Sequence, residues 1–447
     1  MLKVNVGEKR GTCCNGVTRR HALRLGASGL ISGLTLPRLL ELQAKAAETQ
    51  SPKAKACIFI FLQGGPPHQD MWDPKPEAPE EIRGPFRAIQ TSVPGTFVTD
   101  QLPRCAKIAE MYSIVRSHSH NINGHTTGYH YAMTGHRPDF ADGVNPVPFN
   151  NFYPSIGSIV SRELEPGGAI PKYINIPHPL GAGGPGFYGA EHAPFVIEAD
   201  PSQTDFQVKD LNPAARLTEK RQSVRQLLLA DIDQRERDRI QGPAKAMSTY
   251  YEKAYSLITS PEAKRAFDIQ SEPTSSREAY GYTQIGQCAL LARRMIEAGS
   301  RFVGIDSPGW DVHHNCFPSL STDLIPYVDR AFSALVTDLD QRGMLDETLV
   351  IMMGEMGRTP RINKQAGRDH WSMAQSVVFA GGGTKAGQVI GATDKHASAV
   401  ISDPVGVNDI LRTISTLMGI NPDRQYYGPL GRPVPIVDGG KLIPGLI

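Results

Sequence analysis

The chain has 447 residues, 40% of them hydrophobic and 21% charged, which excludes a wholly disordered chain and allows a sizeable core. This length corresponds to one large domain with insertions or to two domains. The formal net charge is +2, but residues 1–47 hold eight Lys and Arg against two acids, so the remainder carries 39 basic and 43 acidic residues. A mildly acidic body of the chain argues against a nucleic-acid-binding surface.

The first 47 residues have the features of a twin-arginine signal peptide. Residues 18–25 read TRRHALRL, an apolar run covers 25–40, and residues 44–46 (AKA) have the small-x-small pattern of a cleavage site. Glycines and a proline interrupt the apolar run, so it does not predict a stable membrane span. We therefore predict a signal peptide over 1–47, use of the twin-arginine export machinery, and a periplasmic or extracellular location. The alternative is a disordered basic tail.

The mature chain, 48–447, alternates predicted strands and helices. Residues 56–62 (ACIFIFL) form a continuous apolar run, which is typical of a buried parallel strand. Further strands are predicted at 112–115, 173–176, 301–305, 348–353 and 376–380, and helices at 127–133, 282–298, 323–342 and 407–418. This alternation predicts an α/β fold with a doubly wound, mostly parallel sheet and helices on both faces. The charged sequence over 207–270 predicts a helical insertion.

Four cysteines remain after the predicted signal peptide: Cys57, Cys105, Cys288 and Cys316. They are widely spaced, with no CxxC pair, and two of them lie in apolar segments. We therefore expect buried free thiols, with a single disulfide as the alternative.

Histidines and acids gather in short polar segments, each of which follows a predicted strand. Residues 116–138 alone carry five histidines, and later segments read GWDVHH (309–314), GEMGR (354–358) and GRDHW (367–371). Loops at the carboxyl ends of strands converge on one crevice in an α/β protein. These side chains are therefore predicted to meet as a metal or catalytic site.

Several of these motifs together resemble the alkaline phosphatase and sulfatase superfamily. Residues 133–138 (MTGHRP) match the end of the helix that carries the sulfatase nucleophile. Residues 348–357 (TLVIMMGEMG) are similar to the metal-binding strand of the superfamily, and 408–420 to its closing helix. Within the superfamily, the chain most resembles a twin-arginine-exported family, the domain of unknown function 1501 family. The resemblance implies an alkaline-phosphatase-like fold over the whole mature chain.

The resemblance also implies metal ligands. The predicted set is Asp70, Asp311, His313, Glu355 and His370. The superfamily has a metal-binding Asp at the end of the first strand, where this chain has Gln63. Asp70, several residues further on, is predicted to replace that Asp. Mixed imidazole and carboxylate ligands favour zinc or manganese, with calcium or magnesium as the alternatives.

His125 occupies the position of the superfamily's nucleophile. It is predicted to act as a metal ligand, as a nucleophile, or as a general acid/base while Thr126 attacks. The alternative for Thr126 is a helix-capping role. Tyr129 stands where the sulfatase signature has Arg, and Met356 replaces a metal-binding His, which excludes a formylglycine sulfatase.

Arg358 is a candidate anion-binding catalytic residue, because its guanidinium fork matches phosphate or sulfate; a salt bridge to a nearby acid is the alternative. The residues predicted to support the ligands or to contact substrate are Gln63, His68, His118, His120 and Asp369.

These features predict an exported, metal-dependent hydrolase of small phosphate or sulfate esters, including esters of a sugar or polysaccharide. A binding or scaffold protein that has lost catalysis on the same fold is the main alternative. A third hypothesis is phosphoryl transfer between positions of one substrate.

Overall fold

The computed structural model describes residues 52–138, 142–143, 153–181, 184–208, 224, 257, 260–428 and 431–447. Pro52–Ile447 forms one compact unit. The predicted signal peptide lies outside the described residues, as does most of the predicted insertion. Of that insertion, the structure describes α9 (Pro261–Phe267) and a short 3-10 helix, η5 (Ile269–Ser271). No helix among the described residues is long and apolar enough to cross a bilayer.

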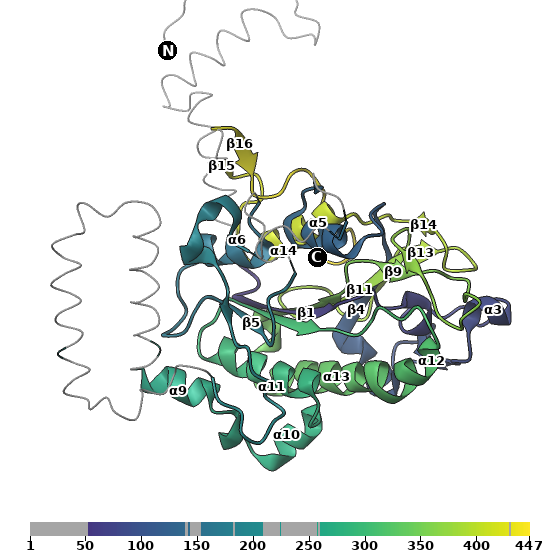
Figure 1. The fold of residues 1–447 in the computed structure, drawn as a ribbon, viewed down its shortest axis with the longest axis horizontal. Coiled ribbons are helices and arrows are strands. Elements are labelled where there is room, and N and C mark those ends of the chain that lie inside the picture. The colour runs from purple at the N-terminus through teal and green to yellow at the C-terminus, as the bar shows by residue number, and fades with distance from the viewer. Residues whose placement is uncertain are drawn as a thin grey trace, which may run out of the picture. The chain divides into compact units, whose positions relative to one another are not determined.

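A single eight-stranded sheet forms the centre of the unit (Figure 1). In order across the sheet its strands are β12 (Val389–Ile390), β4 (Tyr112–His118), β11 (Gln375–Ala380), β8 (Thr348–Met353), β1 (Ala56–Leu62), β7 (Phe302–Ser307), β5 (Tyr173–Ile176) and β6 (Phe195–Val196). All neighbouring strands are parallel except that β11 runs antiparallel to both β4 and β8. The predicted α/β fold with a mostly parallel sheet is confirmed.

β1 lies at the centre because both of its faces are apolar. Every one of its seven residues is buried. Ile58 and Ile60 belong to the hydrophobic cluster on one face, and Phe59 and Phe61 belong to the cluster on the other. A strand with two apolar faces is stable only when helices cover both sides of the sheet.

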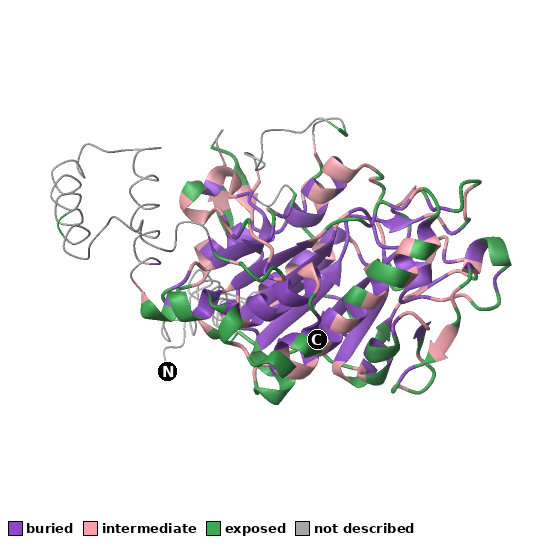
Figure 2. Ribbon diagram, turned by 60° about the horizontal axis from the view of Figure 1, so that its bottom comes forward, coloured by how far each residue is buried: buried purple, intermediate pink, exposed green. Residues whose placement is uncertain are grey.

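Helices cover both faces (Figure 1). The first cluster includes side chains of α4 (Pro103–Lys107), α11 (Gln284–Glu297) and α13 (Ile325–Gln341). The second includes side chains of α5 (His125–Thr134), α6 (Ile156–Glu163) and α14 (Val407–Leu417). Figure 2 shows the sheet as almost entirely buried, with exposed residues on the outer sides of the helices. The sheet is therefore doubly wound.

The remaining elements are short. They are η1 (His68–Asp70), α3 (Glu80–Arg83), η2 (Ala109–Met111), η3 (Gly186–Tyr188), η4 (Ala190–His192), α10 (Thr274–Tyr280), α12 (Cys316–Ser319), η6 (Leu320–Leu324), η7 (Leu345–Glu347) and the paired strands β2–β3 (Ala88–Gln90, Phe97–Thr99), β9–β10 (Gly357–Arg358, His370–Trp371), β13–β14 (Ala392–Thr393, Val400–Ser402) and β15–β16 (Gln425–Tyr427, Pro433–Pro435). The four cysteines of the described chain are free and buried, as expected.

Candidate metal centre at the carboxyl edge of the sheet

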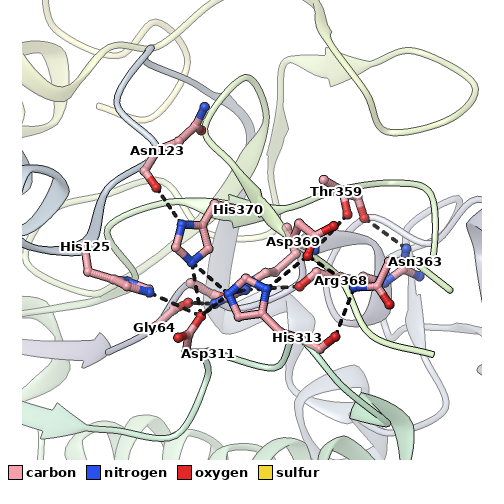
Figure 3. Close-up of polar contacts among 12 residues, drawn as sticks. Gly64, Asn123, His125, Asp311, His313, Thr359, Asn363, Arg368, Asp369 and His370 are labelled. Atoms are coloured by element: carbon pink, nitrogen blue, oxygen red, sulfur yellow. Dashed lines mark hydrogen bonds and ion pairs between the residues drawn. The ribbon is translucent and has the colours of Figure 1, made fainter. Parts of the chain in front are cut away.

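The carboxylate of Asp311 lies at the centre of the candidate site. It follows β7 in sequence, and its Oδ1 lies 2.9 Å from Nε2 of His313. The same oxygen lies 3.2 Å from Nε2 of His125 and 3.2 Å from Nε2 of His370. Figure 3 shows the three rings turned toward this carboxylate. Three histidines from three separate loops, one of them the loop of Asp311 itself, therefore meet at one oxygen atom.

Different parts of the sheet edge supply the three imidazoles. His125 is the first residue of α5, the helix that follows β4. His313 stands two residues beyond Asp311. His370 opens β10, which pairs with β9 so that His370 lies opposite Arg358. Loops after β4, β7 and β8 thus converge, as expected for the carboxyl ends of strands in an open α/β sheet.

An acceptor holds Nδ1 of each ring. Nδ1 of His125 lies 2.6 Å from Oε1 of Glu355, and Nδ1 of His313 lies 3.0 Å from Oδ1 of Asp369. Nδ1 of His370 lies 2.6 Å from the carbonyl oxygen of Asn123. Because carboxylates and carbonyls only accept hydrogen bonds, each ring donates from Nδ1, and a neutral ring then has its lone pair on Nε2.

The donor set fits a cation. Nε2 of His313 and Nε2 of His370 lie 3.0 Å apart, and Nε2 of His125 is buried without a hydrogen-bond partner. Lone pairs that face one another and a carboxylate repel unless a proton or a metal ion lies among them. Ligands at ~2.0–2.2 Å from a tetrahedral zinc are separated by roughly 3.3–3.6 Å, and Nε2 of His125 and Nε2 of His370 each lie 3.2 Å from Oδ1 of Asp311. Within the described chain, His125, Asp311 and His370 form the group with metal-ligand spacing.

Glu355, predicted as a ligand, contacts both the turn after β1 and His125. Its side chain is fully buried, and both carboxylate oxygens accept from the backbone N–H of Gly64, at 2.9 and 3.1 Å. Gly64 follows β1 with φ +117°, and a Cβ there would lie 2.4 Å from the backbone nitrogen of Asp311. The turn after β1 therefore requires glycine at this position. Glu355 lies behind His125, on the Nδ1 side of the ring.

Arg358, predicted to bind an anion, is also fully buried. Its donors engage two carbonyls of the turn after β1, the carbonyl of Arg368, Asp311 and, at 3.4 Å, Nε2 of His313. A guanidinium has five N–H donors; these carbonyls and Asp311 hold four of them, and the fifth points at Nε2 of His313, which has a single lone pair. The alternative predicted for Arg358, a salt bridge to a nearby acid, is confirmed with Asp311 as its partner.

Asp70 does not join the site, which corrects its prediction as a ligand. Its side chain is fully buried in a bidentate ion pair with Arg368, with distances of 2.7 and 2.9 Å. Both oxygens of Asp70 are held by a buried guanidinium, so the carboxylate charge is already paired with Arg368.

The histidines predicted to support the ligands make hydrogen bonds to backbone carbonyls. His68 and His118 are buried, and each ring is held by a backbone carbonyl, Ala397 and Val405 respectively. His120 donates from Nε2 to the carbonyl of Glu355 at 2.7 Å. Thr126 follows His125 in the first turn of α5.

Gln63 links the carboxylate of Asp306 to the hydroxyl of Tyr129. With its amide nitrogen turned toward Asp306, that nitrogen donates to both carboxylate oxygens at 3.1 and 3.2 Å, and its oxygen accepts from the Tyr129 hydroxyl at 2.9 Å. Burial raises the pKa of Asp306 to about 7, and the charge of Glu355 adds to the effect. His178 lies 3.4 Å from Asp306. Asp306 was not predicted from the sequence, although it is the residue before last of β7 and directly follows the apolar run 301–305.

Neighbouring charges act differently on the central groups. Partial burial raises the pKa of Asp311, but the hydrogen bond and charge of Arg358 outweigh it and hold the pKa below the usual range. Burial, and then the charges of His125 and Arg358, lower the pKa of His370. The hydrogen bond to Glu355 raises the pKa of His125 against the opposing effect of burial. A metal at this site would therefore compete with a proton on His125.

Residues 54–447 match the family described as "Protein of unknown function (DUF1501)". No curated protein matches the chain. Similar solved structures include a sulfatase from Pseudoalteromonas sp. (14% identity, 86% of this chain and 70% of that chain covered, TM-score 0.36). They also include a phosphonate monoester hydrolase from Silicibacter pomeroyi (11% identity, 82% of this chain and 73% of that chain covered, TM-score 0.33). A third is alkaline phosphatase from the Antarctic bacterium TAB5 (12% identity, 83% of this chain and 99% of that chain covered, TM-score 0.34).

Proposed function

The chain belongs to the DUF1501 family, and we propose that it is an exported, metal-dependent hydrolase of phosphate or sulfate esters. The observation that carries the proposal is the convergence of three Nε2 atoms on the carboxylate of Asp311, all within 3.2 Å. The proposed ligands are Asp311, His125, His313 and His370. Export rests on the twin-arginine pattern of residues 18–25.

A divalent metal bound here would supply Lewis-acid stabilisation of the negative charge that develops on the ester oxygens. The chain's own residues supply the geometry. Acceptors on each Nδ1 fix the ring orientations, and Arg358 keeps Asp311 ionised and oriented. The side chains of Asp311, His313 and His370 are 47%, 31% and 25% exposed, so a small substrate can approach from that side.

The ligand chemistry favours zinc or manganese. Three neutral imidazoles and one carboxylate are nitrogen-rich, whereas calcium and magnesium prefer oxygen ligands. The substrate class follows from the resemblance of the motifs: a small anionic ester, including one carried by a sugar or polysaccharide.

Metal content and ester turnover together test the proposal. Protein produced with its export signal would be assayed for bound metals by inductively coupled plasma mass spectrometry, then with nitrophenyl phosphate and nitrocatechol sulfate. We expect bound zinc or manganese and turnover that Asp311→Asn abolishes while the protein stays folded. Folded protein that takes up no divalent metal would overturn the proposal.

A binding protein without catalysis is the second candidate. The observation that favours it is that backbone carbonyls and Asp311 hold four of the five N–H donors of Arg358, so at most one donor of that guanidinium is available to a substrate anion. Metal-loaded wild-type protein that binds phosphate or sulfate esters but releases no alcohol would support this candidate over the hydrolase.

A further inference from the structure

We infer that Glu355 is a positioning residue that sets the metal affinity of the centre through His125, without itself coordinating the metal. The inference rests on the proposed metal centre and assigns Glu355 a role that its motif does not predict. It concerns metal affinity and not ester turnover, so the two can be tested separately.

The imidazole ring of His125 separates Glu355 from the proposed ligands. Oε1 of Glu355 lies 2.6 Å from Nδ1, whereas Nε2, on the other side of the ring, lies 3.2 Å from Asp311. Carboxylate ligands lie ~2.0–2.2 Å from zinc, so a metal held at Nε2 is out of reach of Glu355. A carboxylate behind a ligating imidazole fixes the tautomer and raises the basicity of the ring.

Other contacts hold Glu355 in this place. Its oxygens also accept from the N–H of Gly64, in the turn after β1. Its backbone carbonyl accepts from His120, in the loop after β4. A Cβ on Gly128 would lie 3.3 Å from the Glu355 side chain, so the glycine lets α5 approach it closely. Glu355 thus joins three segments that surround His125.

Asp369 provides a matched comparison within the same site. It holds Nδ1 of His313 as Glu355 holds Nδ1 of His125, at 3.0 Å against 2.6 Å. The Asp369 side chain is 56% exposed, whereas that of Glu355 is 0% exposed. Water competes for an exposed carboxylate and screens its charge, so the buried pair makes the larger contribution.

The experiment compares Glu355→Gln with Asp369→Asn in the full chain. Zinc affinity would be measured by competition with a chromophoric chelator, and the ligand environment by the visible absorption of the cobalt-substituted protein. The Glu355→Gln substitution retains the shape of the side chain but removes its charge, and its amide oxygen can still accept from Gly64 and His125, as Oε1 of Glu355 does. We expect zinc affinity to fall roughly 10–100-fold for Glu355→Gln, with unchanged metal stoichiometry and an unchanged cobalt spectrum. For Asp369→Asn we expect the loss of zinc affinity to be several-fold smaller.

A double-mutant cycle with His125→Ala isolates the route of the effect. If Glu355 acts only through His125, Glu355→Gln changes affinity less than roughly 2-fold in the His125→Ala background. An equal loss in both backgrounds, or a cobalt spectrum altered by Glu355→Gln alone, overturns the inference, because it indicates direct coordination. If Glu355→Gln does not fold, Glu355→Asp, which withdraws the carboxylate from Nδ1, replaces it in the cycle.

The failures are distinguishable. Absence of metal binding by the wild type removes the proposed function and this inference with it. Metal binding without ester turnover removes only the hydrolase, and the cycle still decides the role of Glu355.

Discussion

Asp70 and Arg368 form a bidentate ion pair in which both side chains are completely buried, with distances of 2.7 and 2.9 Å. Arg368 also donates to the carbonyls of Ile82, Thr359 and Pro360. The pair therefore links η1, near β1, to the loop that ends in His370. Its position indicates that it supports the loops of the candidate centre and does not coordinate a metal.

Asp70→Asn is expected to destabilise the protein by ~3–5 kcal/mol, because removing one partner leaves a buried charge uncompensated. The measurement is urea denaturation monitored by circular dichroism. Asp403→Asn, an exposed site, serves as a control for loss of an acid. Loss of a metal equivalent from folded Asp70→Asn protein would contradict this assignment and restore Asp70 as a ligand.

His370→Ala is expected to weaken metal binding more than ~100-fold, beyond the range typical of residues that only support ligands. The neighbouring histidine pair offers a control: His314 follows His313 directly but is exposed. His314→Ala should leave zinc affinity, measured by chelator competition, close to that of the wild type. Equal effects of both substitutions would show that His370 is not a ligand.

The sheet was largely predictable from sequence because its strands are continuous apolar runs. Residues 56–62 and 348–353 were predicted as strands, and the structure has β1 and β8 at these positions. The direction of β11 was not predictable, since an apolar run has the same composition whether its neighbours are parallel or antiparallel. Tertiary pairing decides direction.

The sequence predicted which residues form the candidate site, but not how their side chains are arranged. Strand-end loops identified Asp311, His313 and His370, because the carboxyl ends of strands meet. Which face of His125 meets Glu355, and which acid pairs with Arg358, depends on side-chain orientations that sequence spacing does not determine. The partner of Asp70 lies 298 residues away in sequence, so no local pattern indicated it.

His118 is expected to make the protein sensitive to acid. Burial, with a smaller contribution from His120, lowers its pKa from 6.5 to about 3, against the opposing effect of the hydrogen bond to Val405. The folded state therefore binds fewer protons than the unfolded state between these values. Stability is fully present above pH 6.5 and falls by up to roughly 1.4 kcal/mol per pH unit as the pH drops toward 3.

His118→Asn tests this, because Asn can still donate to the Val405 carbonyl but does not titrate. Urea denaturation of both proteins between about pH 7 and about pH 4 should give a shallower loss of stability for the variant. Parallel curves for the two proteins would mean that His118 does not contribute to acid sensitivity.

Gly64→Ala is expected to disrupt the centre through the backbone. Gly64 has φ +117°, and an added Cβ would lie 2.4 Å from the Asp311 nitrogen, so the turn after β1 must move. That turn donates to Glu355 and accepts from Arg358, so its movement displaces groups on both sides of Asp311. Gly95 is the control, because it has φ +79° but no heavy atom lies within 4 Å of an added Cβ. An alanine there measures the cost of the positive φ alone, without a steric clash. We expect Gly95→Ala to cost ~1 kcal/mol with unchanged zinc affinity, and Gly64→Ala to cost ~3 kcal/mol or more with weakened zinc binding. Zinc affinity equal in the two variants would show that the turn does not position the ligands.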